Sequence, residues 1–375
     1  MKKRFLGVLL SVAMVAAVLA GCGSSGAKET AAPAGSETEA ASEAASGETE
    51  AASGETEAAG NTGDVITVGF SQVGAESDWR TANSESMKST FSTENGYNLI
   101  FDDAQQKQEN QIAAIRNFIQ QEVDYIVLAP VTESGWDTVL QEAKDAEIPV
   151  IIVDRMVNVS DDSLYTAWVG SNFKLEGQKA CEWLKQYAAA KNMSEVNIVD
   201  IQGTIGASAQ IGRTEALNEA VEANGWNLLA QQTGEFTQAK GQEVMESMLK
   251  QYDNINVVYC ENDNEAFGAI EAIKAAGKTV GPDGDILVMS FDTTKQGITD
   301  TLSGDIIVNT ECNPLHGPRV EQIIKQLQAG ETPEKQAYVE EGIYAHGSDV
   351  ASVSIDSTDY EVTEVTQDVV DARAY

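Results

Sequence analysis

The sequence is poor in the residues that most often carry catalysis or bind transition metals. It contains two histidines, His316 and His346, and four cysteines, with no Cys-x-x-Cys pair and no Cys/His cluster. There is no Gly-x-Ser-x-Gly turn and no histidine beside a candidate nucleophile, which argues against a Ser-His-Asp hydrolase. Paired carboxylates are present, so residue types alone leave a glycosidase open. We expect a protein that is not an enzyme and that uses no metal or cofactor.

Basic residues are also scarce. There are 24 Lys and Arg against 59 Asp and Glu, and the formal net charge is -35. This charge repels phosphate backbones, so we expect no binding to nucleic acid. The stretch Gly203-x-x-Gly206 lacks the rest of the dinucleotide fingerprint and the phosphate-loop lysine, so a nucleotide is not indicated either. The acidity itself favours solubility.

A long apolar run occurs at the N-terminus, where Phe5 to Ala20 follows the basic start Lys2-Lys3-Arg4. The run is short for a membrane span and is typical of a secretory signal. It ends in Leu19-Ala20-Gly21-Cys22, which resembles the bacterial lipoprotein signal, in which the cysteine becomes lipid-modified. The alternative is an ordinary signal peptide cleaved nearby. We expect residues 1–22 to be a lipoprotein signal with Cys22 lipidated, and the protein to be extracytoplasmic and lipid-anchored to the membrane.

Residues 23–64 form a low-complexity stretch of Gly, Ser, Ala, Thr and Glu, in which Ser-Gly-Glu-Thr-Glu-Ala-Ala occurs twice. With almost no large apolar residue, this stretch cannot offset its ordering entropy by burial. We interpret it as a disordered acidic linker. Beyond it, Cys181 and Cys260 lie in apolar patterns typical of small buried side chains. A disulfide between Cys260 and Cys312 is left open, because sequence alone does not decide pairing.

Strand-length apolar runs alternate with amphipathic helical stretches from Asp64 onward. Ile112, Ile115 and Ile119, for example, share one helix face. The alternation predicts α/β architecture with parallel sheets flanked by helices. It breaks at a linking stretch, residues 163–171, and then restarts, which predicts two lobes with a ligand cleft between them. The predicted strands are residues 66–70, 98–101, 125–129, 149–153, 196–201, 226–231, 257–260, 286–291 and 306–310, with edge strands such as 351–355 in the tail.

Polar side chains follow nearly every predicted strand, and this pattern is the main functional signal. Residues 74–80 form a predicted turn between the first strand and a helix at 82–91. Carboxyl ends of parallel strands meet at one edge of a sheet, where α/β proteins bind ligands. Carboxylates accept hydrogen bonds from paired hydroxyls, Arg donates a planar fork, and aromatic rings cover the apolar face of a sugar. Any single Asp or Asn of this kind is equally explained as a helix cap, so the joint pattern carries the sugar hypothesis.

Several stretches together resemble the periplasmic sugar-binding proteins of the ribose/galactose type, and most closely their galactofuranose-binding members. The matching stretches are ThrValGlyPheSerGlnValGly at Thr67, GluSer-x-TrpArg at Glu76, GlnGlnLysGlnGluAsnGln at Gln105, AlaLysAspAlaGluIleProVal at Ala143, AspArg at Asp154, GlnGlyThr-x-GlyAlaSer at Gln202, GluValMetGluSer at Glu243 and AsnAsp at Asn262. Glu261 departs from the pattern, as does the tail after Tyr338.

The resemblance implies a type I periplasmic-binding-protein fold. Its N-terminal lobe would comprise residues 65–168 and 313–343, and its C-terminal lobe residues 169–312 and 344–375. It implies a monomer that captures a monosaccharide and delivers it to an ABC transporter permease. The alternatives are a sensor that presents the sugar to a chemoreceptor or sensor kinase and, with less support, a glycosidase. The ligand-binding residues carried onto this chain are Glu76, Ser77, Trp79, Arg80, Asp154, Arg155, Thr204, Arg213, Phe236, Asn262 and Asp292.

Overall fold

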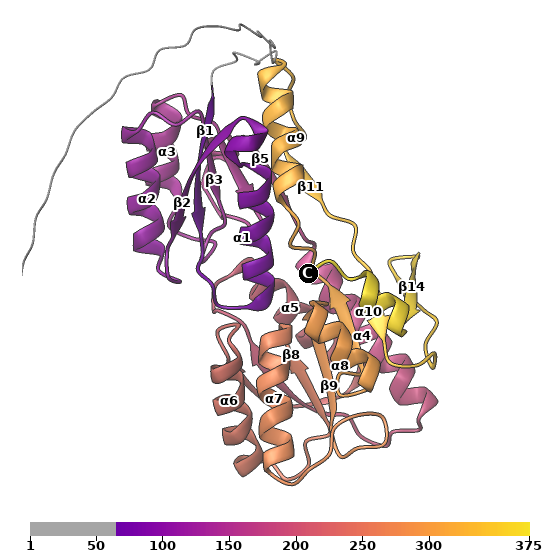
Figure 1. The fold of residues 1–375 in the computed structure, drawn as a ribbon. Helices are drawn as coiled ribbons and strands as arrows, with labels where there is room; N and C mark the ends of the chain where they lie inside the picture. Colours follow the sequence, from indigo (N-terminus) through magenta and orange to yellow (C-terminus); the bar gives the residue numbers. More distant parts are fainter. Residues whose placement is uncertain (1–64) are drawn as a thin grey trace, which may run out of the picture. The chain divides into compact units, whose positions relative to one another are not determined.

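The computed structural model describes residues 65–375 (Figure 1). The predicted signal peptide, Cys22 and the acidic linker lie outside the described residues. Within residues 65–375 the helices are too short or too polar to cross a membrane.

The first lobe is built on a six-stranded parallel sheet in the order β11-β5-β4-β3-β1-β2. Helices α1 and α9 pack on one face of this sheet, and α2 and α3 on the other (Figure 1). The strands are β1 (Ile66–Gln72), β2 (Tyr97–Asp103), β3 (Tyr125–Leu128), β4 (Val150–Val153), β5 (Ala167–Gly170) and β11 (Gln336–Tyr338). The helices are α1 (Asp78–Thr90), α2 (Gln108–Gln120), α3 (Asp137–Asp145) and α9 (Gly317–Gln328), with short 3-10 turns η1 (Thr93–Asn95) and η2 (Asp162–Leu164).

Alternation along the strands divides the core of this lobe in two. On β4, Ile151 and Val153 pack in the cluster below α1 and α9, whereas Val150 and Ile152 pack in the cluster below α2 and α3. Successive strand residues point to opposite faces, so a strand covered by helices on both sides is apolar throughout. This explains why the strands of the sequence are short continuous apolar runs.

The second lobe contains an eight-stranded sheet in the order β13-β14-β12-β10-β9-β8-β6-β7. Its strands pair in parallel except for β10 with β12 and β13 with β14. Helices α4 and α5 cover one face, and α6 and α7 the other. The strands are β6 (Asn197–Gln202), β7 (Asn227–Thr233), β8 (Val257–Cys260), β9 (Leu287–Asp292), β10 (Val308–Glu311), β12 (Ile343–Ala345), β13 (Ser352–Ile355) and β14 (Thr358–Glu364). The helices are α4 (Phe173–Ala190), α5 (Ser208–Asn224), α6 (Gln238–Gln251), α7 (Asp263–Ala275), α8 (Lys295–Ser303) and α10 (Gln367–Ala372).

The chain passes between the two sheets three times. The first crossing is the pair Ser171-Asn172, between β5 and α4. The second is residues 312–316, between β10 and α9, and the third is residues 339–342, between β11 and β12. We use the names first, second and third crossing for these segments below.

Two local expectations were wrong. The predicted turn at residues 74–80 is shorter, because α1 begins at Asp78. The Ser77 side chain accepts a hydrogen bond from the Arg80 N–H and caps the helix one turn earlier than its apolar pattern suggests. The predicted linking stretch at residues 163–171 contains β5, whose residues are all buried in the first sheet. The link itself is the two-residue first crossing.

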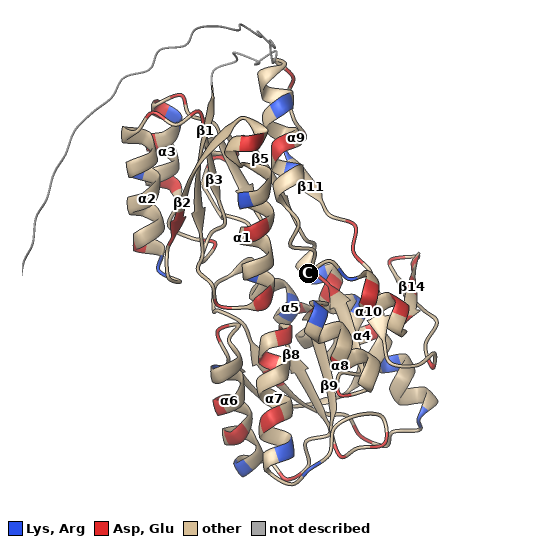
Figure 2. Ribbon diagram, in the orientation of Figure 1, with Lys and Arg blue, Asp and Glu red and all other residues tan. Residues whose placement is uncertain are grey.

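The three cysteines of the described residues are buried, and most charged side chains lie away from the strands. Cys181, Cys260 and Cys312 are buried and free, so the disulfide left open between Cys260 and Cys312 is not formed. Lys, Arg, Asp and Glu lie mainly on helices and loops, and most strands carry none (Figure 2). Among the charged residues at strand ends, Asp292 at the end of β9 and Asp154 after β4 line the cavity described below.

Candidate functional site

One cavity between the lobes gathers most of the residues singled out in the sequence. The empty space in it, including space open to solvent, is about 290 Å³. Ten predicted residues line it: Glu76, Ser77, Trp79, Arg80, Asp154, Arg155, Arg213, Phe236, Asn262 and Asp292. The lining also includes Phe173, Ala209 and Cys312, which the sequence did not indicate. Thr204 is not part of the lining. Its carbonyl accepts from Ala207 N–H and closes the turn before α5.

The first turn of α1 brings an aromatic wall to the cavity. Trp79 is 3% exposed, and its indole N–H donates to the carbonyl of Cys312 at 2.6 Å. The ring packs edge-on against His316, with centroids 5.9 Å apart. The hydrogen bond ties α1 to the second crossing, so the Trp79 ring is fixed from both sides.

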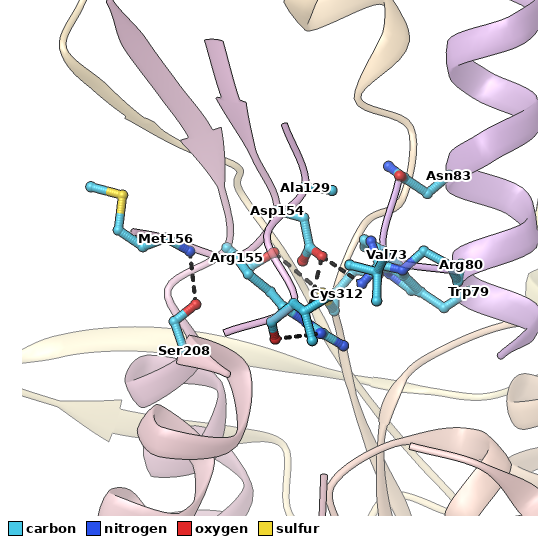
Figure 3. Close-up of polar contacts among 12 residues, drawn as sticks. Val73, Trp79, Arg80, Asn83, Ala129, Asp154, Arg155, Met156, Ser208 and Cys312 are labelled. Carbon is cyan, nitrogen blue, oxygen red and sulfur yellow. Dashed lines mark hydrogen bonds and ion pairs between the residues drawn. The ribbon is translucent and has the colours of Figure 1, made fainter. Parts of the chain in front are cut away.

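Below this wall lies a buried network of two carboxylates and two guanidinium groups. Arg80 Nη2 lies 2.7 Å from Asp154 Oδ2, and Arg80 Nε donates to Glu76 Oε1 at 3.0 Å. Arg155 Nη2 reaches the same Glu76 oxygen at 3.5 Å, and Arg155 Nη1 donates to the carbonyl of Val131 at 3.0 Å. Figure 3 shows Arg80 and Arg155 on two sides of Asp154. Each arginine therefore keeps a partner although water is excluded.

The pKa values in this network follow the competition between burial and opposite charge. Burial opposes ionisation of Asp154, but Arg80 and Arg155 outweigh it and hold the pKa of this carboxyl below its ordinary value. Burial and the neighbouring Arg80 lower the pKa of Arg155 to about 10, against the pull of Glu76 and Asp154. Asp154 and Arg155 are thus both charged near neutral pH.

The second lobe contributes a third guanidinium group from α5. Arg213 Nη2 lies 2.7 Å from Glu176 Oε2 and 3.7 Å from Asp292 Oδ1, and Arg213 Nη1 donates to the carbonyl of Glu261 at 2.5 Å. Burial opposes the charge on Arg213, yet Glu176 and Asp292 help to raise its pKa well above the ordinary value. Burial raises the pKa of the Asp292 carboxyl, although Arg213 opposes the shift. Glu176, on α4, escaped the sequence analysis because it lies inside a helix rather than after a strand.

Each arginine of the cavity lies over an aromatic ring. The distance from its Cζ to a ring centroid is 4.6 Å for Arg80 over Trp79, 5.0 Å for Arg155 over Phe236 and 5.3 Å for Arg213 over Phe173. Such contacts are attractive and hold the planar guanidinium in one orientation. The forks are therefore fixed before any ligand enters.

The Phe236 ring is held through its own backbone. Its N–H donates to Glu265 Oε1 at 2.8 Å, and its carbonyl accepts from Asn262 Nδ2 at 3.1 Å. A Cβ placed on Gly203 would lie 1.9 Å from the ring, so only glycine fits there. Asn262 also caps α7 by accepting from the Glu265 N–H. One amide hydrogen and one oxygen lone pair of Asn262 then remain for a ligand.

Three lining residues have left-handed backbones, which are unusual for side chains with a Cβ. The φ angle is +61° at Asp154, +61° at Phe236 and +99° at Asp292. Such conformations cost about 1–3 kcal/mol each and persist where the surroundings over-determine them, often at functional sites. Asp154 follows β4, Phe236 lies in the loop after β7 and Asp292 is the last residue of β9, and all three line the cavity.

The lobes touch each other around the cavity. Asp78 N–H donates to Asn264 Oδ1 at 3.0 Å, Met156 N–H to Ser208 Oγ at 2.8 Å, and Glu133 N–H to the carbonyl of Gly206 at 2.9 Å. The second of these contacts is visible in Figure 3. This arrangement is a closed cleft rather than an open one.

Some buried polar atoms at the cavity lack a hydrogen-bond partner among the described residues. Glu76 Oε2 is an example, and one hydrogen and one lone pair of the Asn262 amide are also free within residues 65–375. A buried polar atom without a partner costs free energy, so these atoms are poised to bond a polar ligand. Hydroxyl groups, which both donate and accept, match such a mixed set. The geometry suits binding of a small polyhydroxylated molecule.

His316 behind Trp79 makes stability depend on pH. Asn83 Nδ2 donates to His316 Nδ1 at 2.9 Å, which requires a neutral ring, and burial lowers the pKa of His316 to about 4. Because the unfolded chain protonates this ring near pH 6.5, the folded state loses about 2 kcal/mol of stability between pH 7.5 and pH 5. We expect His316→Gln, which keeps an acceptor, to lose about 2 kcal/mol less over that interval.

Urea unfolding at the two pH values measures this difference. The buried carboxyls contribute equally to both proteins and cancel in the comparison. Equal pH dependence of the free energy of unfolding in the two proteins would contradict the neutral, buried state of His316.

The fold and the cavity together define the class of this protein. Residues 68–310 match the family model described as periplasmic binding protein domain, and the chain belongs to that family.

The chain is similar in sequence to the galactofuranose-binding protein YtfQ of Escherichia coli (strain K12). The two are 42% identical over 284 residues, which is 74% of this chain and 87% of that protein. A solved Mycobacterium smegmatis protein in complex with β-D-fucofuranose superposes with a TM-score of 0.72 at 43% identity, over 75% of this chain and 91% of that one. The binding protein of the arabinose ABC transporter of Shewanella sp. ANA-3, bound to α- and β-L-arabinofuranose, gives a TM-score of 0.70 at 42% identity, over 75% and 92%.

Proposed function

We propose that this protein binds one neutral monosaccharide of furanose form, similar to galactofuranose, in the cavity between its lobes and delivers it to an ABC permease. The observation that carries the proposal is the lining itself: three guanidinium groups, carboxylates and aromatic rings face one small space. The named relatives bind or are solved with furanose sugars, which supports a ligand of the same kind. We expect the protein to bind the sugar without catalysing a reaction on it, because the carboxylates are paired with arginines.

The charge balance of the lining favours an uncharged ligand. The lining holds as many acidic as basic groups, because Arg80, Arg155 and Arg213 stand against Glu76, Asp154 and Asp292. Arg213 also pairs with Glu176 just outside the lining. A ligand with its own carboxylate or phosphate would bring an unpaired charge into a site from which water is excluded, which is costly. Neutral sugars are therefore expected to bind, whereas uronic acids and sugar phosphates are not.

The lobe arrangement supports capture by closure. The proposed lobes are residues 65–168 with 313–343 and residues 169–312 with 344–375, and both contribute to the lining. A ligand that contacts both lobes binds the closed form better than the open form and shifts the population toward it. The closed form is the one we propose to dock on the permease.

The protein is proposed to act as a monomer outside the cytoplasm, held at the membrane by lipid on Cys22. The N-terminal sequence supports this placement, as does membership of a periplasmic binding protein family. Mass spectrometry of the N-terminal peptide from the cellular protein would show an acylated Cys22. A mature N-terminus that is unmodified and begins at another residue would refute the proposed lipid anchor.

Titration calorimetry with the purified full-length chain tests the sugar proposal. We expect binding of at least one among L-arabinose, D-fucose, D-galactose, D-ribose and D-fructose, each of which has a furanose form in solution. D-glucuronate and glucose 6-phosphate serve as charged controls and should give no heat. Absence of binding by the whole neutral panel, or preferential binding of the charged sugars, would refute the proposal.

A further inference from the structure

A single carboxyl group joins the three crossings. Glu341 belongs to the third crossing, and its Oε1 accepts a hydrogen bond from Ser171 Oγ of the first at 2.6 Å. The same oxygen accepts from the backbone N–H of Asn313 in the second at 2.7 Å. The side chain therefore bonds both of the other segments that connect the lobes, and any hinge motion must bend these segments.

The second lobe holds Glu341 from the other side. Lys179 Nζ, on α4, donates to the Glu341 carbonyl at 2.9 Å. Cys312 Sγ lies 3.3 Å from Ser171 Oγ, and because that hydroxyl donates to Glu341, the thiol is the donor in this contact. The chain of hydrogen bonds thus runs from Cys312 through Ser171 to Glu341.

Glu176 brings the ligand cavity into contact with this group. A carboxyl oxygen of Glu176, one of Glu341 and the Cys312 sulfur all lie within 4.8 Å of one another. Glu176 Oε2 is occupied by Arg213, whereas Glu176 Oε1 has no hydrogen-bond partner among the described residues. Two carboxyl groups this close repel each other unless one of them carries a proton.

The surrounding charges favour a shared proton. Burial raises the pKa of Glu176 against the opposing effect of Arg213, and burial, with Glu176 adding to it, raises the pKa of Glu341. Burial also raises the pKa of Cys312, so the thiol keeps its hydrogen and a metal ion is not needed to balance the cluster. The charged and titratable groups that face the two carboxyls are Arg213, Lys179, Glu311, Asp292 and Cys312.

We propose that Glu341 is a positioning residue for ligand binding, which clasps the three crossings and fixes Arg213 in the cavity through a proton shared with Glu176. This role rests on the proposed function for its effect on sugar affinity, but the clasp itself does not. Arg213 faces the cavity and is bonded by Glu176, and the proposed proton would bond Glu176 to Glu341. A disturbance at the crossings is thereby transmitted to the binding site.

Hydrogen–deuterium exchange on the ligand-free full chain tests the clasp without a sugar. Glu341→Ala should speed exchange at the amide of Asn313, whose acceptor is lost, and at the neighbouring peptide of the first crossing. Glu341→Gln keeps an oxygen acceptor and should restore slow exchange. Glu340→Ala is the matched control, because Glu340 is exposed and adjacent. Exchange in Glu341→Ala equal to that of the wild type and of the control would overturn the clasp.

Affinity for L-arabinose, or for whichever neutral sugar of the panel the wild type binds, tests the link to Arg213. We expect Glu341→Ala to weaken binding about tenfold, as for the loss of one or two hydrogen bonds, and Glu341→Gln to bind within about threefold of the wild type. In a Glu176→Gln background the effect of Glu341→Ala should shrink, because the path to Arg213 is already broken. The link to Arg213 would be refuted if the affinity losses of Glu341→Ala and Glu176→Gln were fully additive. It would also be refuted if Glu341→Gln bound the sugar as weakly as Glu341→Ala.

The pH dependence of sugar affinity distinguishes a shared proton from a purely structural role of Glu341. Above the raised pKa of the pair the shared proton is lost, and two negative groups face each other. Wild-type affinity should therefore fall as the pH rises through the raised pKa of the pair, whereas Glu341→Gln, whose amide keeps its hydrogens, should respond less. Identical pH profiles would exclude the shared proton. If no sugar binds the wild type, the proposed function fails and the exchange experiment still decides the clasp.

Discussion

Replacement of Arg213 by alanine should abolish measurable sugar binding, with an affinity loss of at least about 1,000-fold, or roughly 4 kcal/mol. The guanidinium is 2% exposed and bonds Glu176, the Glu261 carbonyl and, more distantly, Asp292. Its removal leaves two buried carboxyls facing each other without a cation. Breaking a buried pair in this way costs about 3–5 kcal/mol of stability. We therefore expect a lower free energy of unfolding as well as the loss of binding.

Two further variants separate binding from folding. Arg213→Lys keeps the charge and should fold, but its single ammonium cannot reproduce the fork, so we expect binding about 100-fold weaker than in the wild type. Arg116→Ala is the matched control, because Arg116 is an exposed arginine paired with Glu142, and it should change neither property. Calorimetry and urea unfolding measure both effects. Wild-type affinity in Arg213→Lys would remove Arg213 from the site.

The second large effect is expected for Asp154→Asn, which removes a charge while keeping the shape. Asparagine tolerates the left-handed backbone that Asp154 adopts, so the loop after β4 should persist. Arg80 then loses its partner at 2.7 Å, and Glu76 alone faces two guanidinium groups. We expect affinity to fall about 100-fold and stability by about 2–3 kcal/mol.

The preference of Asp154→Asn for charged or neutral sugars provides a second measurement. With one negative charge removed, the lining carries net positive charge, so Asp154→Asn should gain affinity for D-glucuronate relative to neutral sugars. Asp253→Asn, at an exposed position far along the chain, should alter neither affinity nor selectivity. A variant that retained the wild-type preference for neutral over charged sugars would contradict the charge-balance argument.

The sequence was most informative where local chemistry and topology coincide. Parallel strands all end at the same edge of their sheet, so Phe236 and Asp292 were expected at one edge of the second sheet and Asp154 at one edge of the first. The two-lobed pattern and the resemblance supplied the expectation that these edges face each other. The strand β8 (Val257–Cys260) also has the predicted bounds. The beginning of α1 was misplaced, because a serine cap at residue 77 extends the helix through residues that an apolar pattern does not include.

The site residues that the sequence analysis missed come together only through the way the chain returns between the lobes. Glu176 lies inside α4, Cys312 lies in the second crossing directly after β10, and Glu341 lies in the third crossing. Their proximity depends on how the chain returns between the lobes, which no local periodicity encodes. Asn262 shows the opposite limit, because its residue type suggested a ligand contact, yet most of its hydrogen bonds hold α7 and the Phe236 loop.

The left-handed backbones at Asp154, Phe236 and Asp292 bear on how this pocket could be redesigned. β-branched residues are strained at such φ angles, so library diversity at these three positions would mostly yield misfolded clones. The variable positions of the lining are instead Ser77, Ala209 and Phe173, which stand in ordinary helical or capping geometry. We expect a new specificity to arise from changes in side-chain size at Ala209 and Phe173, with the three residues of left-handed backbone kept unchanged.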